Sequence, residues 1–197
     1  NKQQLEAVQS VEKPTLLLAV PGSGKTTVLV TRLGYMIYCL GIRPEEILTV
    51  TYTVAATNDM RKRFASIFGD ELAARLEFRT INGICAKIIG YYGRCVGKKA
   101  FDLVTDESYK TKLLSAIYTE LIHQYPTESD LKNISTLITY IKNMQLSENE
   151  INKIENEQDI PLLNIYNAYC EQMRKQSLMD YDDQMVYALT MLKVSPQ

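Results

Sequence analysis

The sequence lacks several features that would place it in whole classes of protein. It has a single histidine, no apolar run that approaches the roughly 20 residues needed to cross a bilayer, and no segment near its beginning that resembles a signal peptide. These absences argue against a membrane-spanning or secreted protein. We therefore expect a cytoplasmic protein with no membrane partner.

Cysteine is also sparse, and no two of the four residues form a C-x-x-C pair. Their scattered spacing argues against a disulfide framework and a zinc site, so we interpret them as buried or free thiols in a reducing cytosol. They are Cys39, Cys85, Cys95 and Cys170. The one histidine, His123, has no neighbouring partners of the kind that catalysis needs, and we expect it on or near a helix surface.

Composition and charge divide the chain into two halves. With 197 residues, of which 46% are hydrophobic, it can bury one good core or two small ones. Residues 1–100 contain 14 Lys or Arg and 8 Asp or Glu, whereas residues 101–197 contain 8 and 15. The basic half suits a polyanionic partner such as a nucleotide or nucleic acid, although two solvated surfaces of opposite sign would give the same count.

The most informative motif is a glycine-rich segment near the beginning of the chain. Residues 19–26 read A-V-P-G-S-G-K-T, after Leu16-Leu17-Leu18, which predicts a buried strand, and before residues 27–33, which predict a helix. This order of strand, glycine loop, Lys-Thr and helix is the context of a phosphate-binding loop. Gly22 and Gly24 allow successive backbone N–H groups to converge on one anion.

The two residues that close this motif have specific chemistry. The Lys25 ammonium can bridge the β- and γ-phosphates of ATP, and the Thr26 hydroxyl can ligate Mg²⁺. One departure is Ala19, because the strict pattern has glycine at that position. The alternative is an ordinary glycine-rich turn, but the context on both sides favours a nucleotide site with ATP and Mg²⁺ as cofactors.

The rest of the first half alternates strands and helices, which predicts an α/β fold with a parallel sheet covered by helices. Strands are expected at 47–52 and 77–80, and helices at 55–67 and about 82–92. The second half is almost entirely helical by pattern. Helices are expected from Asp106 to the stop at Pro126, over 131–144, from the capping box at 147–150, over 162–176 and over 181–192.

Four segments, in the correct order around the loop, carry a family resemblance. They are N-K-Q-Q-L-E-A-V at 1–8, V-T-Y-T-V-A-A-T-N-D-M-R at 50–61, R-T-I-N-G-I at 79–84 and L-M-D-Y-D-D at 178–183. With the loop, they resemble the superfamily 1 DNA helicases of the UvrD, Rep and PcrA type over the whole chain. The resemblance implies an incomplete P-loop NTPase (RecA-like) domain 1A over 1–100 and a helical domain 1B over 101–197.

The resemblance also assigns roles to individual residues. Gln4 falls at the position whose amide reads the adenine edge, a contact that an amide group can make. Thr27 stands where the family has an arginine that packs on adenine. The residues expected to contact the nucleotide are Gln4, Pro21, Gly22, Ser23, Gly24, Lys25, Thr26 and Thr27, with Lys25 and Thr26 also catalytic.

For DNA, the resemblance points to Tyr52, Thr53, Thr80 and Asn82. Tyr52 takes the place of an aromatic residue that lines the single-strand groove, where a ring can stack on any base; the alternative is a core tyrosine at the end of a strand. Thr80 and Asn82 can hydrogen-bond phosphate. The family's other DNA-facing residues are replaced here by Val54, Ala55 and Ile81.

The sequence also lacks the acidic pair that the family places at the end of an apolar strand to hold Mg²⁺ and activate water. Asp182-Asp183 is the nearest candidate, but it reads as the first turn of a helix with no strand before it. We therefore expect an N-terminal piece of a larger motor, an ATP-dependent 3′ to 5′ DNA helicase acting on single strands or junctions with repair or recombination proteins. The alternatives are a RecB- or AddA-like motor of a helicase–nuclease complex and an ATP-dependent DNA-binding switch without unwinding.

Overall fold

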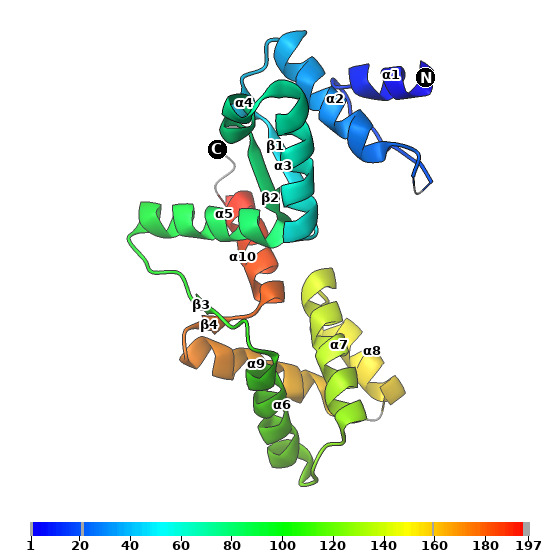
Figure 1. Cartoon of the computed structure of the whole chain (residues 1–197). Coiled ribbons are helices and arrows are strands. Elements are labelled where there is room, and N and C mark those ends of the chain that lie inside the picture. The colour runs from blue at the N-terminus through cyan, green and yellow to red at the C-terminus, as the bar shows by residue number, and fades with distance from the viewer. Residues whose placement is uncertain (1, 21, 159, 195–197) are drawn as a thin grey trace. The chain divides into compact units, whose positions relative to one another are not determined.

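The computed structural model of this chain describes residues 2–20, 22–158 and 160–194. The chain divides into two compact units, Asn1–Ile84 and Cys85–Gln197. Helices make up most of both units, and each unit has a small parallel sheet of two strands (Figure 1). The expected domain boundary near residue 100 stays a prediction.

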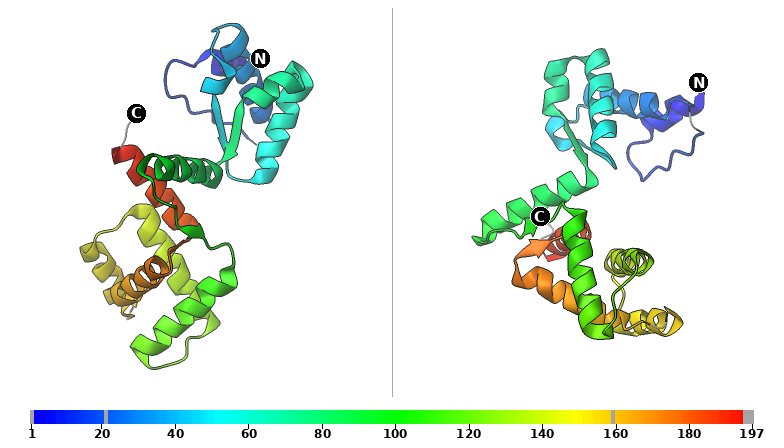
Figure 2. Two further views of the ribbon diagram at one scale, coloured as in Figure 1. Left: turned by 90° about the vertical axis from the view of Figure 1, so that its left-hand side faces the viewer. Right: turned by 60° about the horizontal axis from the view of Figure 1, so that its bottom comes forward.

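The first unit contains the alternating helices and strands that the sequence predicts. Its two strands are parallel, with Thr51 opposite Thr80 at their carboxyl ends, and both views of Figure 2 show them side by side. The elements are α1 (Lys2–Gln9), α2 (Lys25–Tyr38), η1 (Pro44–Glu46), β1 (Leu48–Thr51), α3 (Val54–Phe68), α4 (Asp70–Arg75), β2 (Glu77–Thr80) and the start of α5 (Ile81–Val96). The expected strands at 47–52 and 77–80 and the helix at 55–67 are confirmed.

The core of this unit lies among α2, α3, α4 and the two strands. Phe64 is fully buried, and its ring lies 4.8 Å from that of Phe68 and 6.2 Å from that of Phe78. The buried residues of the cluster are Val30, Leu33, Ile47, Met60, Phe64, Ala73, Leu76 and Phe78. This core fixes α3 against the sheet, and so it fixes the loops that leave the carboxyl ends of the strands.

The strand expected at Leu16-Leu17-Leu18 is not formed. These residues have no strand assignment, and Leu16 and Leu18 are 82% and 81% exposed. A strand needs a neighbour to receive its backbone hydrogen bonds, and β1 and β2 pair only with each other within the described residues. The apolar run therefore has no regular structure, and two of its three leucines are exposed.

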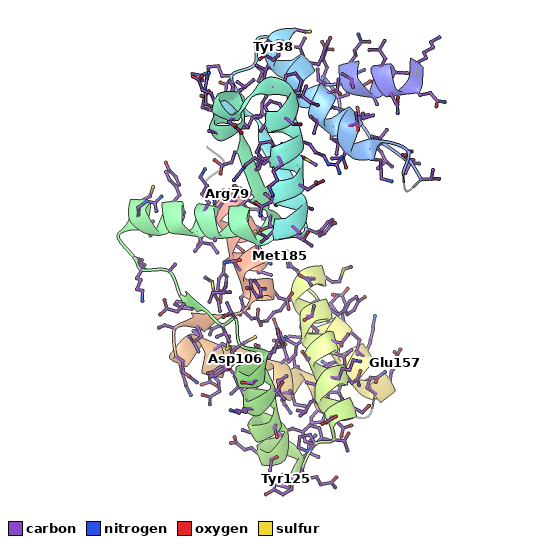
Figure 3. The ribbon with its side chains drawn as sticks, viewed as in Figure 1. Tyr38, Arg79, Asp106, Tyr125, Glu157 and Met185 are labelled. Carbon is purple, nitrogen blue, oxygen red and sulfur yellow. The ribbon has the colours of Figure 1, made fainter. Side chains whose placement is uncertain are left out.

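The second unit is a helical assembly with well-formed helix starts. Its elements are the rest of α5, β3 (Asp102–Leu103), α6 (Glu107–Ile122), α7 (Glu128–Met144), α8 (Glu148–Gln158), α9 (Leu162–Lys175), β4 (Leu178–Met179) and α10 (Tyr181–Val194). Asp106, labelled in Figure 3, caps α6 by accepting a hydrogen bond from the Ser108 amide at 2.8 Å. Before α8 the Glu150 half of the expected capping box is formed, because Glu150 accepts from the Ser147 amide at 2.8 Å and from the Ser147 hydroxyl at 2.6 Å.

Two features of this unit differ from the sequence prediction. Helix α6 ends before Pro126, at Ile122, and exposed His123 follows in the left-handed conformation with φ 59°. Strands β3 and β4 pair in parallel, so a strand does precede the acidic segment. Two-residue strands are too short to show a periodic pattern, which is why the sequence did not reveal them.

Two buried clusters form the core of the second unit. One contains Leu114, Ile117, Ile134, Ile138, Ile165, Tyr169 and Met173, and the other contains Ile141, Ile151 and Leu162. The expected apolar faces of the helices at 131–144 and 162–176 supply most of these residues. The helical character of the second half is therefore confirmed.

Candidate functional site

The glycine loop before α2 has the backbone that an anion site needs. Gly22 and Gly24 both have positive φ, 81° and 88°, and Gly24 is the N-cap residue of α2. The first turn of α2 contains no acidic side chain. A helix N-terminus of this kind offers unpaired N–H groups and a partial positive charge to an anion. Pro21, also expected at this site, lies outside the described residues.

The Lys25 ammonium lies against the beginning of the same loop. It donates hydrogen bonds to the carbonyl oxygens of Ala19 at 2.6 Å and Val20 at 3.1 Å. The Val20 carbonyl also accepts from the Ser23 hydroxyl at 2.7 Å. The two carbonyl oxygens of Ala19 and Val20 thus accept hydrogen bonds from the ammonium within the loop. Thr26, half-buried, and Thr27, exposed, follow in the first turn of α2.

The structure brings Gln4 to this loop. Gln4 lies on α1, and its Nε2 donates a hydrogen bond to the Ser23 carbonyl at 3.2 Å. A side chain at Gly24 would begin 3.4 Å from the same nitrogen, so the amide lies at the mouth of the loop. Residues far apart in the sequence thus meet at one place, as a nucleotide site requires. Whether this amide reads adenine stays a prediction.

The residues expected to bind DNA gather at the carboxyl ends of β1 and β2. Thr51 and Thr80 are register partners there, so Tyr52 and Thr53 leave one strand beside the place where Asn82 follows the other. Tyr52 is 89% exposed. Within the described residues the Tyr52 ring is therefore at the surface, and both its DNA-binding role and the core alternative stay predictions.

A group of threonines fixes the turn that carries Tyr52. The Thr51 and Thr57 hydroxyls are 2.5 Å apart, and each oxygen lies 3.0 Å from the Thr53 carbonyl oxygen, so the two hydroxyl protons are shared among these three contacts. The Thr53 hydroxyl caps α3 by accepting from the Ala56 amide at 3.1 Å. This network uses side-chain oxygens to satisfy backbone groups, and it gives the exposed tyrosine a rigid base.

Two arginines lie beside these strand ends, and one of them, Arg61, is a contact that the sequence did not reveal. The Arg61 guanidinium lies 5.7 Å from the centre of the Phe78 ring and donates to the Phe78 carbonyl at 3.4 Å. Arg79, labelled in Figure 3, is ion-paired with Glu77 on the same strand. The Thr80 hydroxyl accepts from the Gly83 amide at 3.0 Å, which fixes the start of α5. The sequence does not identify Arg61 as the residue that contacts Phe78, because three consecutive residues of α3 are basic and their pattern does not distinguish them.

The acidic segment of the second unit serves a different purpose from metal binding. Lys142, on α7, lies 2.7 Å from both Asp180 and Asp183, and all three side chains are largely buried. Tyr169 donates to Asp180 at 2.9 Å, and Asp182 accepts from Thr139 at 2.7 Å. These carboxylates are occupied by internal partners. Within the described ranges, no group of three or more His, Cys, Asp or Glu residues could hold a metal ion.

Burial and charge act against each other in this triad. Burial alone would raise the pKa of Asp180, but the Lys142 charge and the hydrogen bonds from Lys142, Asp183 and Tyr169 lower the pKa below its ordinary value. Burial raises the pKa of Asp183, where the Asp180 charge adds to the effect and Lys142 only partly opposes it. The triad is therefore a buried structural element of the second unit.

No helix among the described residues is long enough and apolar enough to span a bilayer.

Comparison with known proteins agrees with the family resemblance of the sequence. The whole chain, residues 1–197, matches the family model described as "UvrD/REP helicase N-terminal domain". It is 28% identical over 200 residues to "ATP-dependent DNA helicase PcrA" of Leuconostoc citreum, and 28% identical over 218 residues to "ATP-dependent DNA helicase srs2" of Schizosaccharomyces pombe.

A third relative, "ATP-dependent DNA helicase PcrA" of Staphylococcus epidermidis, is 25% identical over 200 residues. Each of these matches covers 100% of this chain but only 26%, 24% and 27% of the Leuconostoc, Schizosaccharomyces and Staphylococcus proteins respectively. The chain thus spans about a quarter of the length of the relatives that it matches.

Proposed function

Because the chain belongs to the UvrD/REP helicase N-terminal domain family, we propose that it is the ATP-binding N-terminal portion of an ATP-dependent DNA helicase. The observation that carries this proposal is the meeting of the phosphate loop with the Gln4 amide at 3.2 Å. A phosphate site and an adenine-reading amide on neighbouring helices form the two ends of one adenine nucleotide site. The family resemblance of the sequence points to the same assignment.

The nucleotide contacts follow from the chemistry of the loop. Backbone N–H groups from Gly22 to Thr27 would surround the phosphates, and Lys25 would exchange its carbonyl partners for β- and γ-phosphate oxygens. Gln4 would select adenine through paired hydrogen bonds. Thr27 leaves the adenine face without the arginine that the family usually supplies.

A magnesium ion fits this site only together with the nucleotide. Thr26 lies in the first turn of α2 beside the loop, and its hydroxyl is the kind of single ligand that Mg²⁺ accepts when phosphates and water supply the others. When bound, the ion would neutralise phosphate charge.

DNA would lie across the carboxyl ends of β1 and β2. Tyr52 would stack on a base, while Thr53, Thr80 and Asn82 would contact phosphates. In this proposal, residues 1–100 are part of a RecA-like domain 1A and residues 101–197 are domain 1B. The complete protein would translocate 3′ to 5′ on a single strand or at a single-strand–duplex junction, with repair or recombination proteins as partners.

The test is strand separation by the full-length protein that contains this chain. A labelled duplex with a 3′ single-stranded tail should be unwound when ATP and Mg²⁺ are present, and a duplex with a 5′ tail should not. Unwinding of only the 5′-tailed duplex would overturn the polarity. Failure to unwind either duplex, with ATP hydrolysis and DNA binding intact, would favour the alternative of a DNA-binding switch.

That alternative rests on one specific observation. Val54, Ala55 and Ile81 replace polar, charged and aromatic residues that face DNA in the family pattern. In the structure Val54 is 67% exposed at the start of α3, and Ala55 beside it is exposed too, so apolar surface takes the place of polar contacts. A lower affinity for DNA would reduce strand unwinding more than it would reduce nucleotide binding. A RecB- or AddA-like motor would instead reveal itself by a nuclease domain elsewhere in the full-length protein.

A further inference from the structure

Helix α1, which carries Gln4, is fastened to α2 by one arginine. Arg32 lies on α2 and is half-buried. Its Nη1 donates to the Ala7 carbonyl at 3.1 Å, and its Nη2 donates to the Ser10 carbonyl at 2.5 Å. The two helices pack against each other, as Figure 1 shows.

The two acceptors lie at the end of α1, where a helix has unpaired carbonyl groups. The Glu6 carbonyl is satisfied locally, by the amide of Ser10 at 3.0 Å and its hydroxyl at 2.8 Å. The Ala7 and Ser10 carbonyls instead receive the guanidinium. A cation at the C-terminal end of a helix also favourably opposes the helix dipole.

This attachment matters because α1 is short. A helix of eight residues is not stable by itself in water, so its direction depends on its contacts with the rest of the protein. Val8 is the buried apolar residue of α1. One apolar side chain allows a short helix to roll, whereas two directed hydrogen bonds from a planar guanidinium fix its rotation and register.

The same helix, α2, carries both the attachment and the loop. Arg32 lies about two helical turns beyond Lys25, which follows the loop directly. Gln4 lies one turn of α1 before Ala7 and donates to the Ser23 carbonyl in that loop. Helix α1 is thus attached at two places, by Gln4 to the loop and by Arg32 to α2, and the hydrogen bonds of Arg32 go to Ala7 and Ser10 at the end of α1.

We propose that Arg32 is a positioning residue for base selection, which holds the Gln4 amide against the glycine loop, 3.2 Å from the Ser23 carbonyl oxygen. The inference rests on the proposed function, in which Gln4 reads the adenine edge. A purely structural arginine would stabilise α1 without affecting which base is accepted. A positioning arginine affects the choice between adenine and guanine more than it affects turnover.

The test compares four forms of the full-length protein: wild type, Gln4→Ala, Arg32→Ala and the double variant. Steady-state kcat and KM are measured with ATP and with GTP. Arg32→Ala should raise KM for ATP about three- to tenfold, the effect of one misplaced hydrogen-bonding group, and leave kcat and the KM for GTP nearly unchanged. The double variant should resemble Gln4→Ala, because both changes remove one interaction.

Arg75→Ala is the matched control. Arg75 also joins two elements of this unit, since its Nε donates to Glu45 of η1 at 2.7 Å, but it lies on α4, away from α1 and α2 in the sequence. Its removal should leave the preference for ATP over GTP unchanged. Arg32→Gln, which keeps one amide donor, should give an intermediate preference and replaces Arg32→Ala if that variant does not fold.

Each result decides one question. Suppose first that Gln4→Ala abolishes the preference for ATP over GTP. If Arg32→Ala then lowers the melting temperature but keeps the wild-type preference, the positioning role of Arg32 is overturned. If Gln4→Ala itself leaves the preference unchanged, the adenine assignment of Gln4 fails, and the role of Arg32 fails with it. Loss of preference in both single variants without further loss in the double variant supports the inference.

Discussion

At the scale of single residues, the structure separates side chains that build the unit from side chains that are presented to a partner. Gln4 and Lys25 are connected to the phosphate loop, and Thr53 and Thr80 are connected to the starts of the helices that follow them. Tyr52 is different, because its ring is almost fully exposed. An aromatic ring held out by a rigid turn is suited to stacking.

In the full-length protein, Tyr52→Ala should weaken single-strand DNA binding by about 1–3 kcal/mol, the value of one base stacked on an aromatic ring. Tyr52→Phe should have almost no effect, since stacking uses the ring face. The melting temperature should hardly change for either variant, because the side chain is 89% exposed. DNA affinity by fluorescence anisotropy and melting temperature are measured on the same samples.

Tyr125→Ala is the control for this experiment, because Tyr125 is 90% exposed but lies between α6 and α7, outside the motif. Its loss should leave DNA affinity close to that of wild type. Equal losses for Tyr52→Ala and Tyr125→Ala, or a preserved affinity in Tyr52→Ala, would contradict the assignment of Tyr52 to the single-strand groove.

At the scale of elements, helices α7, α9 and α10 of the second unit meet at the buried triad. The Lys142 side chain is 3% exposed and neutralises one of the two carboxylates that face it. Replacing it would leave two buried carboxylates without a cation, which is more costly than the pair is stabilising. The stability of the second unit therefore depends strongly on this triad.

Lys142→Ala should destabilise the protein by about 3–5 kcal/mol at pH 7, and the difference from wild type should shrink as the pH falls towards 4. In wild type, the lowered pKa of Asp180 contributes stability above the ordinary pKa of 3.8, and that stability is lost in acid. In the variant, the carboxyl pKa values are raised, so their cost is present at pH 7 and disappears on protonation. Melting curves at pH 7 and pH 5 test this.

Lys132→Ala, on the exposed face of α7, is the comparison for Lys142→Ala. It should change the melting temperature little at either pH. A destabilisation by Lys142→Ala that is as large at pH 5 as at pH 7 would show that lost packing of the lysine stem, and not buried charge, is responsible.

Sequence reasoning worked best for elements with a local cause. The helices at 55–67 and 131–144 and the strand at 77–80 depend on periodicity and nearby side chains, and all three are confirmed. The Glu150 half of the capping box at Ser147 is formed as well. The strand at 16–18 was wrong because a strand depends on a neighbour that can be distant in the sequence. The same limit hid β3 and β4, which have two residues each.

The candidate sites show the same division. The glycine loop was recognisable because its residues are consecutive, and Gln4 only because of the family resemblance. Arg32, Arg61 and the partners of Lys142 act through contacts between elements, and no spacing in the sequence marks them. Positions of this kind depend on tertiary packing.

At the scale of the whole molecule, the central question is how much of a motor this chain supplies. It contains a glycine loop that is expected to bind phosphate and an expected adenine contact, but its acidic segment after β4 is bound to Lys142. The chain spans about a quarter of the length of the relatives that it matches.

The 197-residue chain alone should therefore bind adenine nucleotides weakly and hydrolyse ATP negligibly, because no carboxylate is expected to position the attacking water. We expect a dissociation constant no better than tens of micromolar, about −6 kcal/mol. Titration calorimetry and a phosphate-release assay measure the two quantities. Robust turnover by the purified chain that Lys25→Ala abolishes would show that the catalytic machinery is already complete.

The most direct test of the account is ATP hydrolysis by the full-length protein, measured with and without single-stranded DNA, in wild type and in Lys25→Ala. The account predicts that DNA stimulates hydrolysis by wild type. It also predicts that Lys25→Ala lowers turnover by about 10²-fold or more, as loss of a charge that stabilises the transition state does, while DNA binding persists. Wild-type turnover in Lys25→Ala, or hydrolysis indifferent to DNA, would contradict the assignment of residues 19–26 as the ATP site of a DNA motor.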